Sequence, residues 1–314
     1  MIILRNIYQA SAFTKNSTVV IGNFDGLHLG HRKIIVNAQK LAYPNKMGII
    51  TFEPHPRDYF LKNSTPFKLV RTETKYTLLK ELEVDFVVEL QFNRQLENYT
   101  PEKFVSKILA KNLAVKNVMV GEDFRFGHKR SGDFKMLKKL GTNNNINAFA
   151  INLDNIDEKA ISSTRIRKAL ERGELQDAKD LLGYWHRIYG KVIRGDQRGR
   201  ELGYPTANIE LKGILIPRHG IYSCIIEILS GKFAGSFKGA ASIGKKPTFG
   251  TNQTNLEVHI FDFSHDIYGI EVAVSLMNFQ RPEEKFESID SLIEQMELDC
   301  EQARLYLSSF ALSK

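Results

Sequence analysis

Hydrophobic positions follow two different rhythms along this chain. In the first part, short apolar runs alternate with segments of helical periodicity, which predicts buried strands separated by helices. The apolar runs are residues 19–24, 48–52, 86–90, 118–121 and 148–153. Such an alternation predicts a parallel sheet with helices on both faces. In sheets of this kind a ligand binds beyond the carboxyl ends of the strands.

The second part of the chain has short alternating runs split by Gly, Pro and Asn, which is typical of an antiparallel, barrel-like sheet. A change of pattern near residues 183–186 predicts two domains, residues 1–184 and 185–314, each large enough for its own core. Helical periodicity precedes and follows the barrel-like region. The predicted strands are residues 188–194, 221–229, 240–243, 256–263 and 272–277, and the predicted helices are residues 163–182 and 283–307.

A net charge of +8 favours anionic partners. The basic residues are scattered among acids and form no long run, so we expect small phosphates and no nucleic acid. Apolar runs are too short to cross a bilayer, and the N-terminus lacks the layout of a signal peptide, which predicts a cytoplasmic protein without a membrane partner. Cys224 and Cys300 lie far apart without metal-ligand spacing. The oligomeric state is left open.

Residues 22–31, GNFDGLHLGH, join a predicted strand to a predicted helix. The unpaired backbone N–H groups at the helix start favour a bound phosphate. His28 and His31 are three residues apart, so both can meet one anion, and Gly30 lets a nucleotide approach the backbone. The glycine spacing fits neither a dinucleotide-binding turn nor a P-loop. The alternative interpretation is a glycine turn whose histidines only cap the helix.

Three other strings in this half combine polar, aromatic and cationic side chains. TFEPHPR (residues 51–57) and GEDFRFGHKRSG (residues 121–132) follow predicted strands, so we expect them to converge with residues 22–31 on one crevice. The longer string can stack on a planar ring while its arginines meet phosphate, although an ordinary basic surface loop also fits. ISSTRIR (residues 161–167) offers hydroxyls and two arginines at a helix start, where simple capping also explains the hydroxyls.

In this order, the strings resemble the flavin adenylyltransferase domain of bacterial bifunctional riboflavin kinase/FAD synthetases. The motifs are GxFDGxHxGH, TFEPHPR, GxDFxFGxxRxG and SSTxIR. The resemblance implies a nucleotidyltransferase-type, Rossmann-like α/β domain in which FMN attacks the α-phosphorus of ATP and pyrophosphate leaves. It implies catalytic histidines that bind the ATP phosphates, a Ser-Thr-Arg group that closes over them, and a flavin beside the long loop. These residues are His28 and His31; Gly22, Phe24, Asp25, Gly30, Ser163, Thr164 and Arg167 for the nucleotide; and Asp123 and Phe124 near the flavin.

The barrel-like part contains its own polar constellation. Residues 195–208 form a glycine-rich, cationic loop ending in Pro-Thr-Ala-Asn, and Thr206 and Asn208 face one side of an extended chain. Together they can bind one oxygen-seeking ion such as Mg²⁺. In residues 255–263, alternation puts Glu257 on one face with His259, Phe261 and Phe263, which makes it a candidate general base for a hydroxyl. A turn before an edge strand and an ion-paired carboxylate are the alternatives.

GRxLGYPTAN, PRHGIY, IGKKPTF, LEVHIFDF and FQRPEEKF resemble the riboflavin kinase domain of the same family. The resemblance implies a small antiparallel β-barrel with a C-terminal helix that phosphorylates riboflavin to FMN. Thr206 and Asn208 would hold Mg²⁺–ATP, Glu257 would take the proton of the ribityl 5′-hydroxyl, and Arg281 would flank the flavin. The loop that would cover the phosphates contributes Gly199, Arg200 and Gly203.

Together the two resemblances span nearly the whole chain. They imply a bifunctional enzyme with Mg²⁺, ATP as co-substrate, and riboflavin, FMN and FAD as substrates and products. One alternative is a nucleotidyltransferase for another acceptor, which would not need the Pro-Thr-Ala-Asn string or Glu257. The other is a non-enzymatic flavin-binding regulator of nucleic acid, suggested by the net charge alone, which would show salt-sensitive binding and no ATP turnover.

Overall fold

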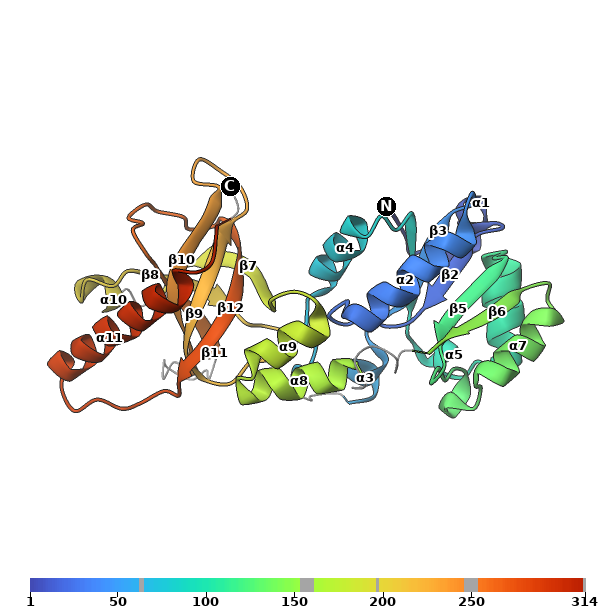
Figure 1. The fold of residues 1–314 in the computed structure, drawn as a ribbon. Helices are drawn as coiled ribbons and strands as arrows, with labels where there is room; N and C mark the ends of the chain where they lie inside the picture. Colours follow the sequence, from blue (N-terminus) through green and yellow to red (C-terminus); the bar gives the residue numbers. More distant parts are fainter. Residues whose placement is uncertain (62–64, 153–160, 196–197, 246–253, 313–314) are drawn as a thin grey trace. The chain divides into compact units, whose positions relative to one another are not determined.

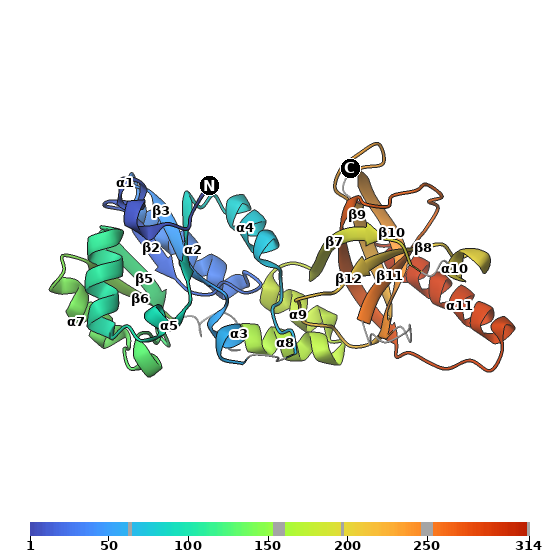
Figure 2. The same cartoon turned by 180° about the vertical axis from the view of Figure 1, so that it is seen from behind.

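The computed structural model describes residues 1–61, 65–152, 161–195, 198–245 and 254–312, which form two compact units (Figures 1 and 2). The first unit comprises Met1–Thr65 and Thr72–Ser162, and the second comprises Pro66–Arg71 and Ser163–Lys314. Residues 163–182, which the sequence pattern grouped with the N-terminal domain, are thus clustered with the barrel. In the described part of the chain, no helix is both long enough and apolar enough to cross a membrane.

The first unit is built on a six-stranded sheet in which every pairing is parallel, so the predicted sheet is confirmed. Its order is β1-β4-β3-β2-β5-β6. Its strands are β1 Ile2–Leu4, β2 Thr18–Ile21, β3 Met47–Glu53, β4 Phe86–Gln91, β5 Asn117–Gly121 and β6 Asn147–Ile151. Its helices are η1 Ile7–Gln9, α1 Ser11–Thr14, α2 Leu29–Ala42, α3 Pro56–Phe60, α4 Thr72–Glu81, α5 Arg94–Glu97, α6 Pro101–Lys103, η2 Phe104–Asn112, η3 His128–Arg130 and α7 Phe134–Thr142.

Helices cover both faces of this sheet, which is why all four residues of the central strand β2 are buried. Helix α2 packs against β2, β3 and β5, and it lies in front of the sheet in Figure 1. Val19 and Ile21 of β2 share a core cluster with Phe104 and Val105 of η2. The first unit therefore buries strand side chains against helical segments in the way that the alternating pattern predicted.

Strand β2 ends earlier than the sequence predicted. The expected strand ran to residue 24, but β2 ends at Ile21. Phe24, Gly26 and Leu27 have φ angles of 53°, 79° and 40°, so the chain leaves the extended conformation there. Positive φ in non-glycine residues is uncommon and concentrates at functional turns. The last residue of the predicted strand 148–153 lies outside the described residues.

The second unit contains a closed, antiparallel six-stranded barrel with a long C-terminal helix, which confirms the prediction. The strand order is β10-β11-β8-β7-β12-β9, and α11 packs against β9, β10 and β12. Its strands are β7 Arg187–Ile193, β8 Thr206–Glu210, β9 Gly220–Ile228, β10 Gly235–Lys245, β11 Thr254–Ile260 and β12 Glu271–Arg281. Its helices are α8 Ser163–Arg172, α9 Leu175–Leu182, α10 Arg198–Glu201 and α11 Ile289–Leu307.

The strands predicted at 240–243 and 272–277 are longer than expected, as β10 and β12, and single residues set the bounds of three other predicted elements of the second unit. The helical segment 163–182 is broken at Gly173, whose φ of 78° ends α8. The C-terminal helix begins at Ile289 and not at residue 283, because the Ser288 side chain caps it by accepting from the Ser291 N–H. Strand β11 ends at Ile260, before Asp262 with its φ of 57°.

The segment Pro66–Arg71 belongs to the barrel unit because its backbone and its last side chain are hydrogen-bonded there. The Leu215 N–H donates to the Lys68 carbonyl (2.7 Å), and the Arg71 guanidinium donates to the Glu210 carbonyl (2.7 Å). Nε2 of the buried His186 is 3.0 Å from the Leu69 carbonyl. These partners are more than a hundred residues away in sequence, so no local sequence pattern predicts these hydrogen bonds.

Candidate active sites

The turn between β2 and α2 brings the two predicted histidines into direct contact. His28 is the N-cap of α2, and its Nδ1 accepts a hydrogen bond from the His31 N–H (3.3 Å). The two imidazole rings stack with centroids 3.6 Å apart and an interplanar angle of 16°. The Phe24 ring centroid lies 5.1 Å from that of His31. The histidines therefore do cap the helix, as the alternative interpretation held, and they also form a fixed pair at its N-terminus.

His31 has hydrogen-bonding capacity left over. Within the described part of the chain its buried Nδ1 has no hydrogen-bond partner. Burial lowers the pKa of His31 well below 6.5, and the neighbouring His28 lowers it further. The ring is therefore neutral at neutral pH before any anion arrives. An unpaired polar atom at the positive end of a fourteen-residue helix suits a phosphate group.

The loops predicted to converge with this turn follow adjacent strands, because β3, β2 and β5 are neighbours in the sheet. The Thr51 hydroxyl donates to the Asn23 carbonyl (3.4 Å), which ties the end of β3 to the turn. The Lys75 ammonium donates to the same hydroxyl (3.1 Å) and is only 7% exposed. Sequence reasoning missed Lys75, since its place in α4 carries no motif.

The predicted flavin-side residues lie at the end of β5. Asp123 is exposed, and the Phe124 ring stacks on the buried Phe126 ring with centroids 5.5 Å apart. Asp25 is buried within the β2–α2 turn, and a Cβ on Gly22 would lie 3.3 Å from the Phe24 ring. These positions group the predicted residues of the first unit, including Gly30 in the first turn of α2, around the carboxyl ends of β2 and β5.

The remaining residues predicted for this nucleotide site begin helix α8 in the second unit. Ser163 is the first residue of α8, and Thr164 follows it. Arg167 donates from Nε to the Phe67 carbonyl (2.8 Å), and its guanidinium lies 5.1 Å from the Phe67 ring centroid. Because His28 lies in the first unit, closure of these residues over the same phosphates stays a prediction.

In the barrel, β8 and β11 bring the predicted kinase residues together. Their antiparallel register places Asn208 opposite Glu257 and Thr206 opposite His259. The Thr206 hydroxyl donates to the Glu257 carboxylate (3.3 Å), and the Asn208 amide lies 3.5 Å from the same hydroxyl. Thus a carboxylate, a hydroxyl and an amide from two strands form one polar cluster.

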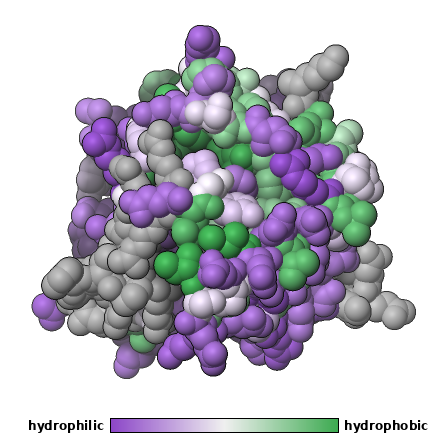
Figure 3. Space-filling view, turned by 90° about the vertical axis from the view of Figure 1, so that its left-hand side faces the viewer, coloured by the Kyte–Doolittle hydropathy of each residue, from purple (hydrophilic) through white to green (hydrophobic). Residues whose placement is uncertain are grey.

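Two pockets meet at Thr206. A pocket of about 350 Å³, here called the helix-side pocket, is lined by Glu257, Arg281 and side chains of α11; a pocket of about 400 Å³, the loop-side pocket, is lined by Asn208 and residues 263–268. Thr206 lines both. In Figure 3, hydrophobic residues gather near the middle of the face viewed from the barrel side, among hydrophilic ones.

The sequence predicted that Glu257, Phe261 and Phe263 share one face of a strand. This prediction is wrong for the two phenylalanines, which follow His259 beyond the end of the strand. Strand β11 ends at Ile260, and Phe261 is buried against Ala240 and Ala303. Phe263 lines the loop-side pocket, whereas Glu257 lines the helix-side pocket. The turn at Asp262 separates the two aromatic residues from the strand's alternation.

Apolar side chains form much of the wall of the helix-side pocket. Leu202, Ile221, Phe286, Leu292 and Met296 line it, together with Cys300. Burial raises the pKa of the Cys300 thiol to about 11, so this part of the wall stays uncharged. A planar, largely apolar ring fits such a lining, with polar groups at a few fixed points.

Glycines shape the loop beside Asn208. A Cβ on Gly195 would lie 2.4 Å from the Asn208 amide nitrogen, and one on Gly199 would lie 2.5 Å from the Tyr204 carbonyl oxygen. Gly203 has a φ of 86°, which favours glycine. The Arg200 side chain and residues 246–249 of the IGKKPTF string lie outside the described part.

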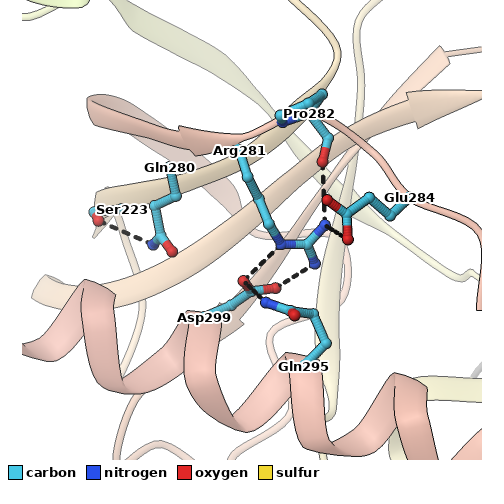
Figure 4. A network of polar contacts seen from close by, with 7 residues as sticks. All are labelled: Ser223, Gln280, Arg281, Pro282, Glu284, Gln295 and Asp299. Atoms are coloured by element: carbon cyan, nitrogen blue, oxygen red, sulfur yellow. Dashed lines mark hydrogen bonds and ion pairs between the residues drawn. The ribbon is translucent and has the colours of Figure 1, made fainter.

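Arg281 is held by hydrogen bonds from all three of its guanidinium nitrogens (Figure 4). Its Nε and Nη2 donate to the two oxygens of Asp299 at 2.8 and 2.6 Å, and Nη1 donates to the Pro282 carbonyl at 3.1 Å. Sequence reasoning missed Asp299. The sequence pattern that could have identified Asp299 is an acid within the otherwise apolar stripe of α11 that includes Leu292, Met296 and Ala303.

The described residues contain no group of three or more His, Cys, Asp or Glu side chains that could hold a metal ion. A divalent cation in the barrel would use the oxygen atoms of Thr206 and Asn208 together with substrate phosphates, which leaves the Glu257 carboxylate for another role. Mg²⁺ commonly binds with few protein ligands in this way. The donor set of the polar cluster fits that ion.

Comparison with known proteins agrees with this two-part arrangement. The FAD synthetase family model matches residues 10–165, and the riboflavin kinase model matches residues 182–307. The bifunctional riboflavin kinase/FMN adenylyltransferase of Haemophilus influenzae is 38% identical over 98% of this chain and 100% of its own length. The protein of that name from Escherichia coli K12 is 36% identical over 100% of this chain and 99% of its own length.

A solved structure has the same fold over nearly the full length. The crystal structure of a macrolide-efflux protein from Streptococcus pneumoniae matches with a TM-score of 0.85 and 30% sequence identity. The match covers 97% of this chain and 99% of that one. Both units therefore have a counterpart within one known chain.

Proposed function

Because this chain belongs to the family of bifunctional riboflavin kinase/FMN adenylyltransferases, it phosphorylates riboflavin to FMN and adenylylates FMN to FAD, and we propose how its residues divide these reactions. One observation carries the assignment in the barrel. Thr206 lines both pockets and donates a hydrogen bond to Glu257, so groups bound in the two pockets can meet beside this carboxylate.

The helix-side pocket binds riboflavin in this proposal, because its apolar lining suits the flavin ring and its polar end contains Glu257. The loop-side pocket binds ATP, with its terminal phosphate directed to Thr206. Glu257 accepts the proton of the ribityl 5′-hydroxyl as that oxygen attacks the γ-phosphorus and ADP leaves. Arg281 forms a cationic wall beside the flavin, and the loop with Gly199, Arg200 and Gly203 covers the phosphates.

Mg²⁺ would be held by Thr206 and Asn208 in this site, where it would neutralise phosphate charge. The protein itself supplies the positions of the reactants, since Asn208 is fixed between β11 and the Gly195 backbone. Positioning of this kind accounts for much of the rate enhancement in phosphoryl transfer.

Adenylyl transfer takes place at the β2–α2 turn in this proposal. The backbone N–H groups of α2 and the stacked pair His28 and His31 bind the ATP phosphates, and their charge stabilisation favours departure of pyrophosphate. Nδ1 of His31, which has no hydrogen-bond partner among the described residues, supports this role. Gly22, Phe24, Asp25 and Gly30 shape the turn, and Asp123 and Phe124 contact the flavin. The roles of Ser163, Thr164 and Arg167 toward the same phosphates stay a prediction from the sequence.

The test of the kinase assignment is Glu257→Gln, which keeps the shape of the side chain and removes the base. We expect FMN formation from riboflavin to fall about 100-fold or more, because a positioned base contributes that much. Conversion of added FMN to FAD stays unchanged. Flavin chromatography measures both, with Glu227→Gln as the matched control, since Glu227 is a partly buried acid on β9 that lines neither pocket. Loss of both activities in Glu257→Gln would contradict the assignment.

A cytoplasmic location and the lack of nucleic-acid partners stay expectations from the sequence.

A further inference from the structure

Asp299 is a buried acid whose place in the reaction nothing above assigns. It lies in the middle of α11, and only 4% of it is exposed. Both oxygens of its carboxylate are bonded to Arg281, and Oδ1 also accepts from the Gln295 amide (3.0 Å). A buried carboxylate is costly unless it is paired in this way. With its oxygens thus occupied, Asp299 is suited to hold another group and not to act as a base.

Asp299 holds the guanidinium of Arg281, which lines the helix-side pocket. Two parallel hydrogen bonds fix the plane of the Arg281 guanidinium, and a third, from Nη1 to the Pro282 carbonyl, fixes its edge (Figure 4). The Glu284 carboxylate lies 3.9 Å from Nη1, and the Phe286 ring centroid lies 5.8 Å from the guanidinium carbon. Bidentate pairing makes this cation a flat, rigid surface.

The same ion pair also joins two walls of the pocket. Arg281 is the last residue of β12, whereas Asp299 lies in α11, which lines the pocket with Leu292, Met296 and Cys300. Hydrogen bonds between the strand end and the helix therefore set the distance between the cationic and the apolar parts of the lining. A ring bound between them depends on both.

We propose that Asp299 is a positioning residue for riboflavin, acting through Arg281; this rests on the proposed place of Arg281 beside the flavin. Asp299 orients the guanidinium plane and holds α11 at the spacing that the ring requires. The kinase step itself does not use the Asp299 carboxylate. Its removal therefore weakens flavin binding more than it slows phosphoryl transfer.

The chain offers a matched control in the same helix. Arg304 of α11 makes two hydrogen bonds, at 2.9 and 3.0 Å, to Asp262 at the end of β11. That pair also joins α11 to the barrel, but the Asp262 side chain is 78% exposed and does not line the helix-side pocket. Exposed ion pairs contribute little. Asp262→Asn therefore tests whether loss of any ion pair on α11 has the same effect.

The experiment measures steady-state FMN formation by the full-length protein carrying Asp299→Asn, Arg281→Ala or both substitutions. We expect Asp299→Asn to raise KM for riboflavin about 10- to 100-fold with much smaller changes in kcat and in KM for ATP, since misplacing a positioning group has effects of that size. Asp262→Asn changes none of these constants. The double variant is no worse than Arg281→Ala, because both substitutions remove one interaction.

An unchanged KM for riboflavin in Asp299→Asn would overturn the proposal, as would additive losses in the double variant. If Arg281→Ala leaves that KM unchanged while Glu257→Gln still abolishes FMN formation, the place of Arg281 beside the flavin is wrong and the role of Glu257 stands. Retained kcat shows that Asp299→Asn is folded. Should it fail to fold, Gln295→Met, which removes one of the three bonds to Asp299, must give a smaller rise in the same KM.

Discussion

Two buried histidines show that a ring nitrogen without a hydrogen-bond partner can belong to a ligand site or to a structural contact. His31 and His186 each have a buried ring nitrogen without a hydrogen-bond partner in the described part of the chain, and burial lowers the pKa of both. His31 lies at the N-terminus of α2, in a turn with several positive φ angles. His186 instead holds the Leu69 carbonyl with Nε2. The first position suits a ligand, whereas the second fixes the segment Pro66–Arg71 to the barrel unit.

The lowered pKa of His186 predicts a loss of stability in acid. The unfolded chain binds a proton near pH 6.5, but the folded chain binds it only at lower pH. The contribution of His186 to the free energy of unfolding is therefore fully present above pH 6.5 and is lost below it, by up to about 1.4 kcal/mol per pH unit. In His186→Gln, which keeps a donor toward Leu69, this fall is shallower.

Trp185, the single tryptophan, reports on this unit. Its fluorescence during urea unfolding between about pH 5 and 8 measures the slope. A His186→Gln variant with the wild-type slope would show that another group is responsible.

At the scale of elements, the start of α11 determines one wall of the helix-side pocket. Ser288 and Ser291 form a reciprocal cap, which sets the first helical residue at Ile289. We expect Ser288→Ala to lower the free energy of unfolding by about 1 kcal/mol, the usual cost of a lost N-cap. Fraying of the first turn also raises KM for riboflavin, because Leu292 lines the pocket.

Tryptophan fluorescence and FMN formation measure the two effects. Ser309→Ala, at an exposed serine just after the same helix, is the control and changes neither. Equal values for Ser288→Ala and the wild-type protein would mean that the cap does not hold this wall.

Local signals account for most of what could be predicted from the sequence. Apolar runs and alternation predicted the parallel sheet and the barrel because each strand buries its own side chains. The shared strand face of Thr206 and Asn208 followed from their spacing, whereas their joint role with Glu257 was implied by the family resemblance. No local pattern predicts the contacts of Arg71 with Glu210 or of Arg281 with Asp299, because they depend on the finished fold. The predicted helix bounds were wrong where a single residue ends or caps a helix, as Gly173 does after α8 and Ser288 does before α11.

For the whole molecule, the division into two compact units predicts that the two activities can be separated and recombined. The β2–α2 turn belongs to the first unit, and the Thr206–Glu257 cluster belongs to the second. The Glu257→Gln protein should still convert added FMN to FAD but should form very little FMN from riboflavin. A His28→Ala, His31→Ala double variant should form only FMN, with adenylyl transfer reduced about 100-fold or more, because such a site acts through charge stabilisation.

Mixing these two variants with riboflavin, ATP and Mg²⁺ tests how FMN moves from one reaction to the next. If FMN is released, the mixture forms FAD after a lag that shortens as the His28→Ala, His31→Ala protein is increased, since that protein supplies free FMN. Chromatography of samples taken over time measures the lag, and each variant alone with riboflavin forms no FAD beyond its residual activity. A mixture that accumulates FMN without FAD, although Glu257→Gln converts added FMN, would contradict this independence of the two sites.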